Sequence, residues 1–521
     1  MNLKKLVLLV TLLTPFLSKA QIPTIPTNND FKCGINPQTA ALIEQRLMDN
    51  RQLFTRQEVQ DLTSKRSITY IPLTITNVAD TSGIGRTSEQ TILGFLCGLN
   101  AIYADQNVQF FIHGTIRNRE STYIYNNAGT PTARGHMLTY RVPNTLNLII
   151  GSSINNPVAS WYDGFGDFVF LLKQMLTSEA KTEAHEIGHF FTLPHTFYGW
   201  ENKDVEALYG GQNVPQFSWI ERADRTGPLA NCHTTADKFC DTPADYYSDR
   251  KNCPYIPTVS DPNGNAIDPD ESNIMSYAFD ACVTNFSTEQ KNAIAMDIAS
   301  RTWVTNTPTN TATVTGIPTA VSPLNNGQLG DINNSTVRLE WTPVTGATMY
   351  YLEVYTMQFF GLWVPNTNSP IHQGIIYSAN PYFDLPTDDL VVGSRYAWRV
   401  KALNSVSTCA TVSSYSAFEA VTSVATNLKD LPIEKQMTFT VNSNPITTSF
   451  IPLSIYSAEE VIGSIRIYGM DGRIALDLTK QLINEGESLV QLPADGLANG
   501  MYIAVLFTER GQLQQKIILQ R

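Results

Sequence analysis

Three of the seven histidines of this 521-residue chain fall within the eleven residues from His185 to His195. His185 and His189 are one helical turn apart, so their imidazoles can share a metal ion on one face of a helix. Glu186 follows the first of them, and its carboxylate could take a proton from a water molecule at the metal. Pro194 ends the helix, and the turn that follows can bring His195 round as a third ligand. Three imidazoles leave one tetrahedral position for water, as a catalytic zinc ion requires.

The segment HEIGHFFTLPH resembles the motif of the metzincin clan of zinc metallopeptidases, and residues 33–301 look most like the ulilysin-type pappalysins. Asn273–Cys282 is similar to the family's Met-turn segment. The resemblance implies that Met275 lies under the zinc ion and that Tyr277 lines the site and helps to stabilise the oxyanion. The alternatives are a plain core methionine and, for the whole motif, a chance match on a buried helix whose histidines bond to backbone carbonyls.

One position departs from the family pattern, because Thr192 stands where the family has Gly. Gly adopts a positive φ easily, whereas a β-branched residue rarely does. Either the turn before His195 takes a different backbone conformation, or it carries strain of about 1–3 kcal/mol. Because Glu186 and all three histidines are present, we expect an active enzyme.

The first twenty residues are typical of a secretory signal peptide. Lys4 and Lys5 precede an apolar stretch, Leu6–Leu17, and small residues end the segment at Ala20. The alternative is a membrane anchor, but about 20 apolar residues are needed to span a bilayer. We therefore expect no integral membrane segment after signal removal. A net charge of −11 without a basic stripe argues against nucleic acid as a partner.

Composition and periodicity divide the chain into a signal peptide and five further parts. The predicted fold class is multidomain: an α/β (α+β) metzincin catalytic domain followed by two all-β sandwich domains. We expect strands over Ile71–Ile75, Val108–Ile112 and Leu146–Ile150, and a helix over Glu89–Ala104. The predicted parts are 1–20 (signal peptide), 21–66 (pro-segment), 67–304 (catalytic domain), 305–323 (linker), 324–426 and 436–521 (the two β domains).

The two β domains resemble different families. Residues 324–426 look like a fibronectin type III domain, which could bind a substrate or, as we expect, act as a spacer. Residues 436–521, with Asn444-Pro445 and a terminal strand Lys516–Leu519, resemble the C-terminal sorting domain of the type IX secretion system. That resemblance implies the secretion machinery as a partner and a secreted, extracellular or cell-surface location. The alternative is a further adhesive sandwich.

Seven cysteines in an exported chain are disulfide candidates. Cys232, Cys240, Cys253 and Cys282 are clustered, and spacing alone permits three pairings. The family resemblance implies Cys232 with Cys253, and Cys240 with Cys282.

The segment CDTPA, which begins at Cys240, also resembles the family. It implies a structural Ca²⁺ ion held by the oxygen atoms of Asp241, Thr242 and Asp245. The alternative is a set of solvated loop acids.

Two further residues bear on regulation and specificity. Cys33, followed by Gly, resembles the pappalysin zymogen switch, in which a thiolate takes the zinc position that water needs. The alternative is a Cys33–Cys97 disulfide. Asp280 is five residues after Met275, and the metzincin resemblance implies that its segment walls the pocket for the residue after the scissile bond. The Asp280 carboxylate would favour substrates with Arg or Lys at that position. The alternative is that Asp280 is a solvated loop acid.

The sequence therefore predicts a secreted zinc-dependent endopeptidase, made as a latent zymogen. It would use one catalytic Zn²⁺ ion, with Ca²⁺ as a candidate structural ion, and act on protein or peptide substrates. The alternative is a non-catalytic surface adhesin or binding protein whose metalloprotease domain is inert.

Overall fold

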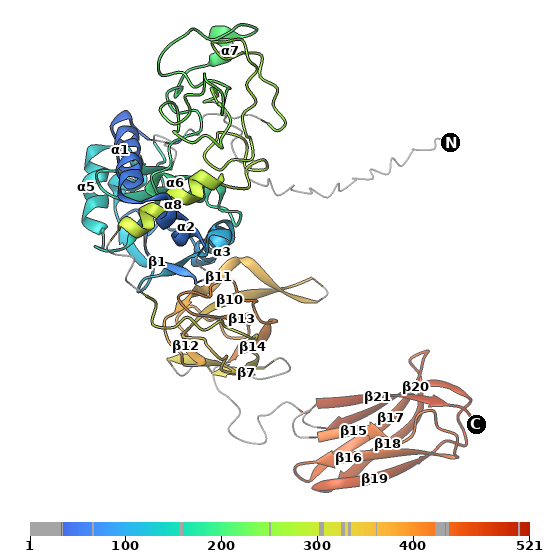
Figure 1. Cartoon of the computed structure of the whole chain (residues 1–521). Coiled ribbons are helices and arrows are strands. Elements are labelled where there is room, and N and C mark those ends of the chain that lie inside the picture. Colours follow the sequence, from blue (N-terminus) through green and yellow to red (C-terminus); the bar gives the residue numbers. More distant parts are fainter. Residues whose placement is uncertain are drawn as a thin grey trace, which may run out of the picture.

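The structure is a computed structural model of the whole chain (Figure 1). The signal peptide predicted for residues 1–20 lies outside the residues that the structure describes. No helix in the described part of the chain is long and apolar enough to cross a membrane. The structure describes residues 33, 35–64, 67–155, 160–248, 252–301, 307–324, 329–331, 335–360, 362–421, 433, 437–508 and 511–521.

A twisted, mostly parallel sheet forms the centre of the N-terminal half, with strand order β2-β1-β4-β6-β5. β3 pairs with the far end of β1, and β5 is antiparallel to β6. The three predicted strands are confirmed. The strands are β1 (Thr69–Ala79), β2 (Val108–Ile112), β3 (Arg117–Glu120), β4 (Leu146–Gly151), β5 (Trp161–Asp163) and β6 (Phe168–Leu172).

Both faces of this sheet are covered, which is why β4 is buried along its whole length and is apolar except for Asn147. Alternate side chains point to opposite faces, so Leu148 packs with α3 and α6, whereas Ile149 packs with α4 and α5. The predicted helix over 89–104 is confirmed as α3, which ends one residue earlier. The helices are α1 (Pro37–Leu53), α2 (Arg56–Thr63), α3 (Glu89–Tyr103), α4 (Thr122–Asn127), α5 (Pro131–Tyr140), α6 (Lys181–Phe190), α7 (Val205–Tyr209) and α8 (Thr288–Ser300), with short 3₁₀ turns at Ala104–Gln106 and Lys173–Met175.

The chain between α6 and α8 is mostly irregular and is cross-linked by two disulfide bonds. The bonds join Cys232 to Cys240 and Cys253 to Cys282, with Cα separations of 5.1 and 5.9 Å. The predicted pairing of Cys232 with Cys253 and of Cys240 with Cys282 is therefore wrong. Residues 232–240 fold back on themselves and bring their end cysteines within bonding distance, so each bridge closes a short loop.

The middle β domain is a sandwich of two sheets around a core that includes Trp341 and Trp398. Its sheets have the strand orders β11-β10-β13-β14-β8 and β12-β9-β7. The strands are β7 (Ala320–Ser322), β8 (Leu329–Asp331), β9 (Thr336–Trp341), β10 (Met349–Phe359), β11 (Trp363–Ile376), β12 (Tyr382–Pro386), β13 (Arg395–Leu403) and β14 (Ser416–Val421).

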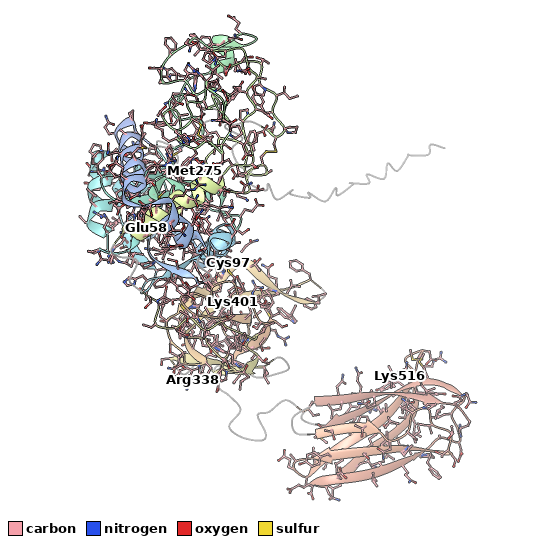
Figure 2. All side chains as sticks on the ribbon, viewed as in Figure 1. Glu58, Cys97, Met275, Arg338, Lys401 and Lys516 are labelled. Atoms are coloured by element: carbon pink, nitrogen blue, oxygen red, sulfur yellow. A yellow bond between two sulfur atoms is a disulfide. The ribbon has the colours of Figure 1, made fainter. Side chains whose placement is uncertain are left out.

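This sandwich is joined to the N-terminal half both covalently and through a shared core. A disulfide links Cys97 on α3 to Cys409, 312 residues later, and Cys97 lies where the two parts meet (Figure 2). Tyr351 and Leu403 of the sandwich belong to the same buried cluster as α3 and α6. Because Cys97 is bonded to Cys409, the alternative Cys33–Cys97 disulfide is excluded, and Cys33 is a free thiol.

The C-terminal β domain is a second sandwich with a separate core. Its sheets have the strand orders β15-β16-β19 and β18-β17-β20-β21. The strands are β15 (Met437–Val441), β16 (Phe450–Ser457), β17 (Val461–Gly469), β18 (Ile474–Ile483), β19 (Gly486–Pro493), β20 (Gly500–Thr508) and β21 (Gly511–Leu519).

Candidate metal centre

The structure brings the three histidines of the motif together. The Nε2 atom of His189 lies 3.1 Å from that of His185 and 3.2 Å from that of His195. These nitrogens and the Cys33 sulfur all lie within 4.8 Å of one another. Burial and the two neighbouring imidazoles lower the pKa of His189, which keeps its ring neutral, as metal binding requires. The donor set of three imidazoles and one sulfur fits a zinc ion.

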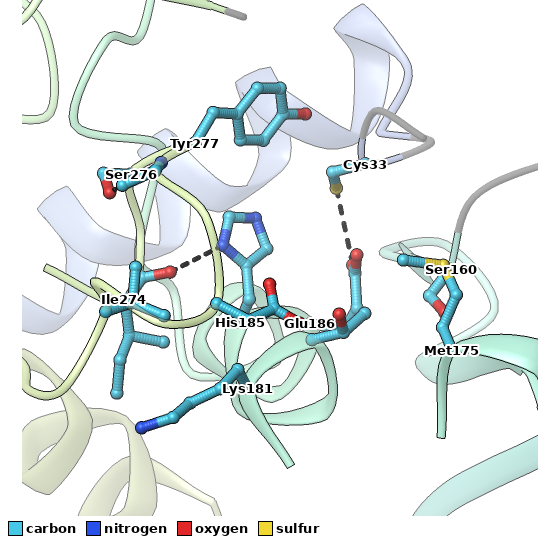
Figure 3. A pocket seen from close by; sticks show the side chains of 13 residues that line it. Cys33, Ser160, Met175, Lys181, His185, Glu186, Ile274, Ser276 and Tyr277 are labelled. Carbon is cyan, nitrogen blue, oxygen red and sulfur yellow. Dashed lines mark hydrogen bonds between the residues drawn. The ribbon is translucent and has the colours of Figure 1, made fainter. Parts of the chain in front are cut away.

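The Nδ1 atoms of His185 and His189 point away from the centre, and each is hydrogen-bonded to a backbone carbonyl group. His185 Nδ1 lies 2.7 Å from the carbonyl oxygen of Ile274 (Figure 3), and His189 Nδ1 lies 2.7 Å from that of Leu193. These carbonyls can only accept, so each Nδ1 donates and each Nε2 is left with its lone pair toward the centre.

His195 is positioned by a residue that the sequence reasoning missed. Its Nδ1 lies 3.4 Å from a carboxylate oxygen of Glu201, whose other oxygen accepts the backbone N–H of Gly199. Burial by itself would raise the pKa of Glu201, but the hydrogen bonds from His195 and from backbone groups lower it overall. Glu201 lies in an irregular loop, so no helical or strand periodicity in the sequence indicates that its side chain faces His195.

The turn that carries the chain from α6 to His195 has a left-handed residue at Thr192, with φ = +68°. Thr192 N–H donates to the carbonyl of His189, and Leu193 N–H donates to that of Gly188, a Schellman ending in which Gly is the usual left-handed residue. Of the two alternatives drawn from the sequence, the structure therefore shows the strained one. The Thr192 hydroxyl is buried and has no hydrogen-bond partner among the described residues.

Met275 lies directly beneath α6 and is fully buried. A Cβ atom at Gly188 would lie 2.5 Å from the Met275 sulfur, so only Gly at this helical position lets the two segments pack this closely. The carbonyl oxygen of Met275 accepts the N–H of Thr196, next to His195. Together with the bond between Ile274 and His185, the segment around Met275 thus contacts residues at or next to all three histidines.

Glu186 and Cys33 face each other at the open side of the centre. The Cys33 thiol lies 3.4 Å from a carboxylate oxygen of Glu186 and donates to it (Figure 3). Burial raises the pKa of Glu186 to about 8, while the hydrogen bond from Cys33 acts to lower it. Burial, with the nearby Glu186 charge, also raises the pKa of the Cys33 thiol.

Tyr277 lines the same pocket as Cys33 and Glu186. Its ring centroid lies 5.0 Å from that of His195 and 4.5 Å from that of Phe197. Burial raises the pKa of the Tyr277 phenol well above its usual range, and the neighbouring Cys33 and Glu186 add to the rise. The phenol therefore stays protonated and can donate a hydrogen bond.

A pocket opens beside the centre, and both Asp280 and Lys181 line it together with His185 and Glu186. Behind it, burial raises the pKa of Glu183 to about 8, and the Asp280 charge adds a smaller contribution. Glu183 is a second residue that the sequence reasoning missed, because an acid in the first turn of a helix is ordinarily a solvated one.

The residues predicted to hold calcium have protein partners. Asp241 accepts hydrogen bonds from Ser287 Oγ and the Glu289 N–H, and so caps α8. Thr242 donates to Asp237, and Asp245 accepts from Thr196 and from the N–H of Tyr247. Within the described residues, they are not among the groups of three or more His, Cys, Asp and Glu donor atoms that lie close enough to share an ion. The calcium site stays a prediction.

Comparisons with known proteins identify one part of the chain. The family model described as a secretion system C-terminal sorting domain matches residues 442–520. The protein is therefore secreted, and it is either attached to the cell surface or released outside the cell. No curated protein matches the chain.

Several solved structures share a weak likeness with the chain. A promirolysin mutant from Tannerella forsythia is 15% identical, with a TM-score of 0.36, over 52% of this chain and 95% of that chain. Mirolysin in complex with a compound is 16% identical, with a TM-score of 0.33, over 46% of this chain and 94% of that chain. The chicken interferon gamma receptor alpha chain is 12% identical, with a TM-score of 0.15, over 40% and 99%. At these scores the likenesses carry no weight for function, which rests on the geometry of the site.

Replacing Thr192 by Gly should raise the free energy of unfolding by about 1 kcal/mol, because the change releases a strained backbone and a buried, unpartnered hydroxyl. Urea denaturation of the parent and the variant measures the difference. Thr192→Val is the matched control, since it removes the hydroxyl but keeps the β-branch. A Gly variant less stable than the Val variant would contradict strain at this turn.

Proposed function

We propose that this protein is a secreted zinc-dependent endopeptidase that is made in a latent form. The observation that carries the proposal is the convergence of three imidazole nitrogens, one carboxylate and one free thiol in a single buried site. Among the described residues, the only other group of three such side chains contains Cys232 and Cys240, which are bonded to each other.

His185, His189 and His195 would hold the zinc ion through Nε2, each oriented by the partner of its Nδ1 atom. The ion would supply the Lewis acidity that peptide-bond hydrolysis needs at neutral pH. Glu186 would take the proton from the attacking water and pass it to the leaving amine. The Tyr277 phenol, which stays protonated, would donate a hydrogen bond to the oxyanion that develops on the substrate.

The direct test replaces Glu186 by Gln in the secreted protein and compares it with the parent after residues 21–66 of both have been cleaved off. Cleavage of an unfolded protein substrate should fall at least about a hundredfold, because the general base is lost while the three metal ligands remain. Zinc content, measured by elemental analysis, should be unchanged. Equal cleavage by both proteins, or activity that survives a chelator, would contradict the mechanism and favour the binding-protein alternative.

Latency is supported by how the pro-segment packs. Ile43 and Leu47 of α1 are buried in the same core as α6, so the helix is part of the fold and not an added arm. Arg46 pairs with the buried Asp297 of α8 at 3.0 Å, and its other terminal nitrogen donates to the Tyr162 hydroxyl at 2.8 Å. Cys33 is four residues before α1, and its sulfur lies within 4.8 Å of the three imidazole nitrogens, which supports the proposal that it would take the position that a reacting water needs.

Replacing Cys33 by Ala should give an unprocessed protein that cleaves substrate, because nothing then fills the fourth ligand position. Peptidase activity measured before any cut in residues 21–66 checks this. Gln45→Ala changes an exposed residue of α1 and should stay latent. If the Cys33 variant folds normally but remains as inactive as the parent, the thiol is not the switch.

Asp280 is proposed to select substrates with Arg or Lys after the scissile bond. It lines the pocket next to His185 and Glu186, where partial burial strengthens the interaction between opposite charges. Lys181 lines the same pocket, so the preference depends on which of the two charges lies nearer the substrate.

Asp280→Asn should reduce the preference for Arg and Lys at that position about tenfold, which peptide-library profiling of the activated protein can measure. Asp268→Asn removes the same charge from an exposed loop position and should leave the preference unchanged. If the parent protein prefers apolar residues after the scissile bond, the proposed role of Asp280 is wrong.

A further inference from the structure

The hairpin formed by β10 and β11 ends in large apolar side chains that face solvent. The exposed fractions are 62% for Phe359, 73% for Phe360, 63% for Leu362 and 41% for Trp363. Figure 1 shows this hairpin extending beyond the rest of the middle sandwich. We call these four side chains the aromatic tip. They lie far from the shared core, so packing within the domain does not account for them.

The chain around the tip carries no formal charge. No Asp, Glu, Lys or Arg occurs between Glu353 and Asp384, although these residues make up 16% of the whole chain. Arg395 of the neighbouring strand lies over the Trp363 ring, 5.0 Å from its centroid, at the base of the tip. Arg395 is also paired with Glu419 at 3.3 Å, so its charge is compensated within the sandwich. The uncharged, apolar tip itself is what suits an apolar layer.

The backbone of the tip is paired on the side where β10 and β11 face each other, while the outer side of β11, the edge strand of its sheet, stays at the hydrated headgroup level. β10 and β11 pair as far as Phe359 and Trp363, and the N–H of Phe360 donates to the carbonyl of Leu362 at 3.0 Å. Backbone groups that are paired inside the hairpin need not be desolvated on entry into lipid, which is the main cost of placing non-helical chain there.

The size of the tip argues against a stable protein partner. At 150–250 Å² for a large aromatic side chain, the exposed parts of the four residues sum to roughly 450 Å². A standard protein interface buries about 800 Å² on each partner. Insertion into a lipid surface requires no such area, because each ring is surrounded by acyl chains and headgroups on its own.

We propose that the aromatic tip inserts into the interface of a lipid bilayer and so holds the secreted protein at a membrane surface. The net charge of the chain is −11, so the preferred surface is zwitterionic and not anionic. Trp favours the headgroup level of a bilayer, and Phe and Leu favour the boundary between headgroups and acyl chains. The inference does not depend on the proposed peptidase activity.

Vesicle flotation with the full-length secreted protein tests the proposal. The parent should bind phosphatidylcholine vesicles, and the triple variant Phe359→Ser, Phe360→Ser, Leu362→Ser should bind at least tenfold more weakly. The control variant Val391→Ser, Val392→Ser removes two other exposed apolar residues of the same sandwich and should bind like the parent. Adding phosphatidylglycerol to the vesicles should weaken binding at low salt.

A second measurement follows the tip itself. Vesicles should shift the Trp emission of the parent to shorter wavelength, and Trp363→Phe should remove most of that shift. Three outcomes would overturn the proposal: a parent that does not float, a triple variant that floats as well as the parent, or a tip-dependent self-association in solution that vesicles do not compete with. The last outcome would assign the tip to a second copy of the chain.

Discussion

The three imidazole rings of His185, His189 and His195 must each present Nε2 to one common point, and much of the N-terminal half serves that requirement. Two of the histidines are on α6, but the groups that orient the three rings come from three places: the end of α6, the segment beneath it at Ile274, and the loop that holds Glu201. Because these segments are separate in the chain, the centre exists only when the irregular region between α6 and α8 is folded. The two short disulfide loops in that region restrict the conformations it has to search.

Burial of charged groups connects the chemistry of the site with its stability. Glu186 sits in a dry environment that raises its pKa to about 8, and the pro-segment contributes to that environment by covering the centre. The same pro-segment buries Ile43 and Leu47 in the core that supports α6. Burying two such side chains is worth about 1.5–3 kcal/mol each, so a cut that removes the pro-segment also removes part of the core. Activation and stability are therefore physically linked in this chain.

The two β sandwiches have different relations to the rest of the molecule. The middle sandwich shares a core with α3 and is tied to it through the Cys97–Cys409 bond, whereas the C-terminal sandwich has a core of its own. Because the middle sandwich contributes to the core of its neighbour, the two parts form one packed unit. A surface such as the aromatic tip would then hold the site at a fixed orientation to whatever the tip binds.

The sequence by itself determined the features that depend on residues close together in the chain. The helical spacing of His185 and His189, the stop at Pro194 and the alternating strands could all be predicted, because a helical turn or a strand imposes its own period. Only the tertiary structure decided the disulfide partners, the close packing of Gly188 on Met275, and the role of Glu201. These contacts join segments through irregular loops or across as many as 312 residues, and no local period specifies which distant group a loop will bring into contact.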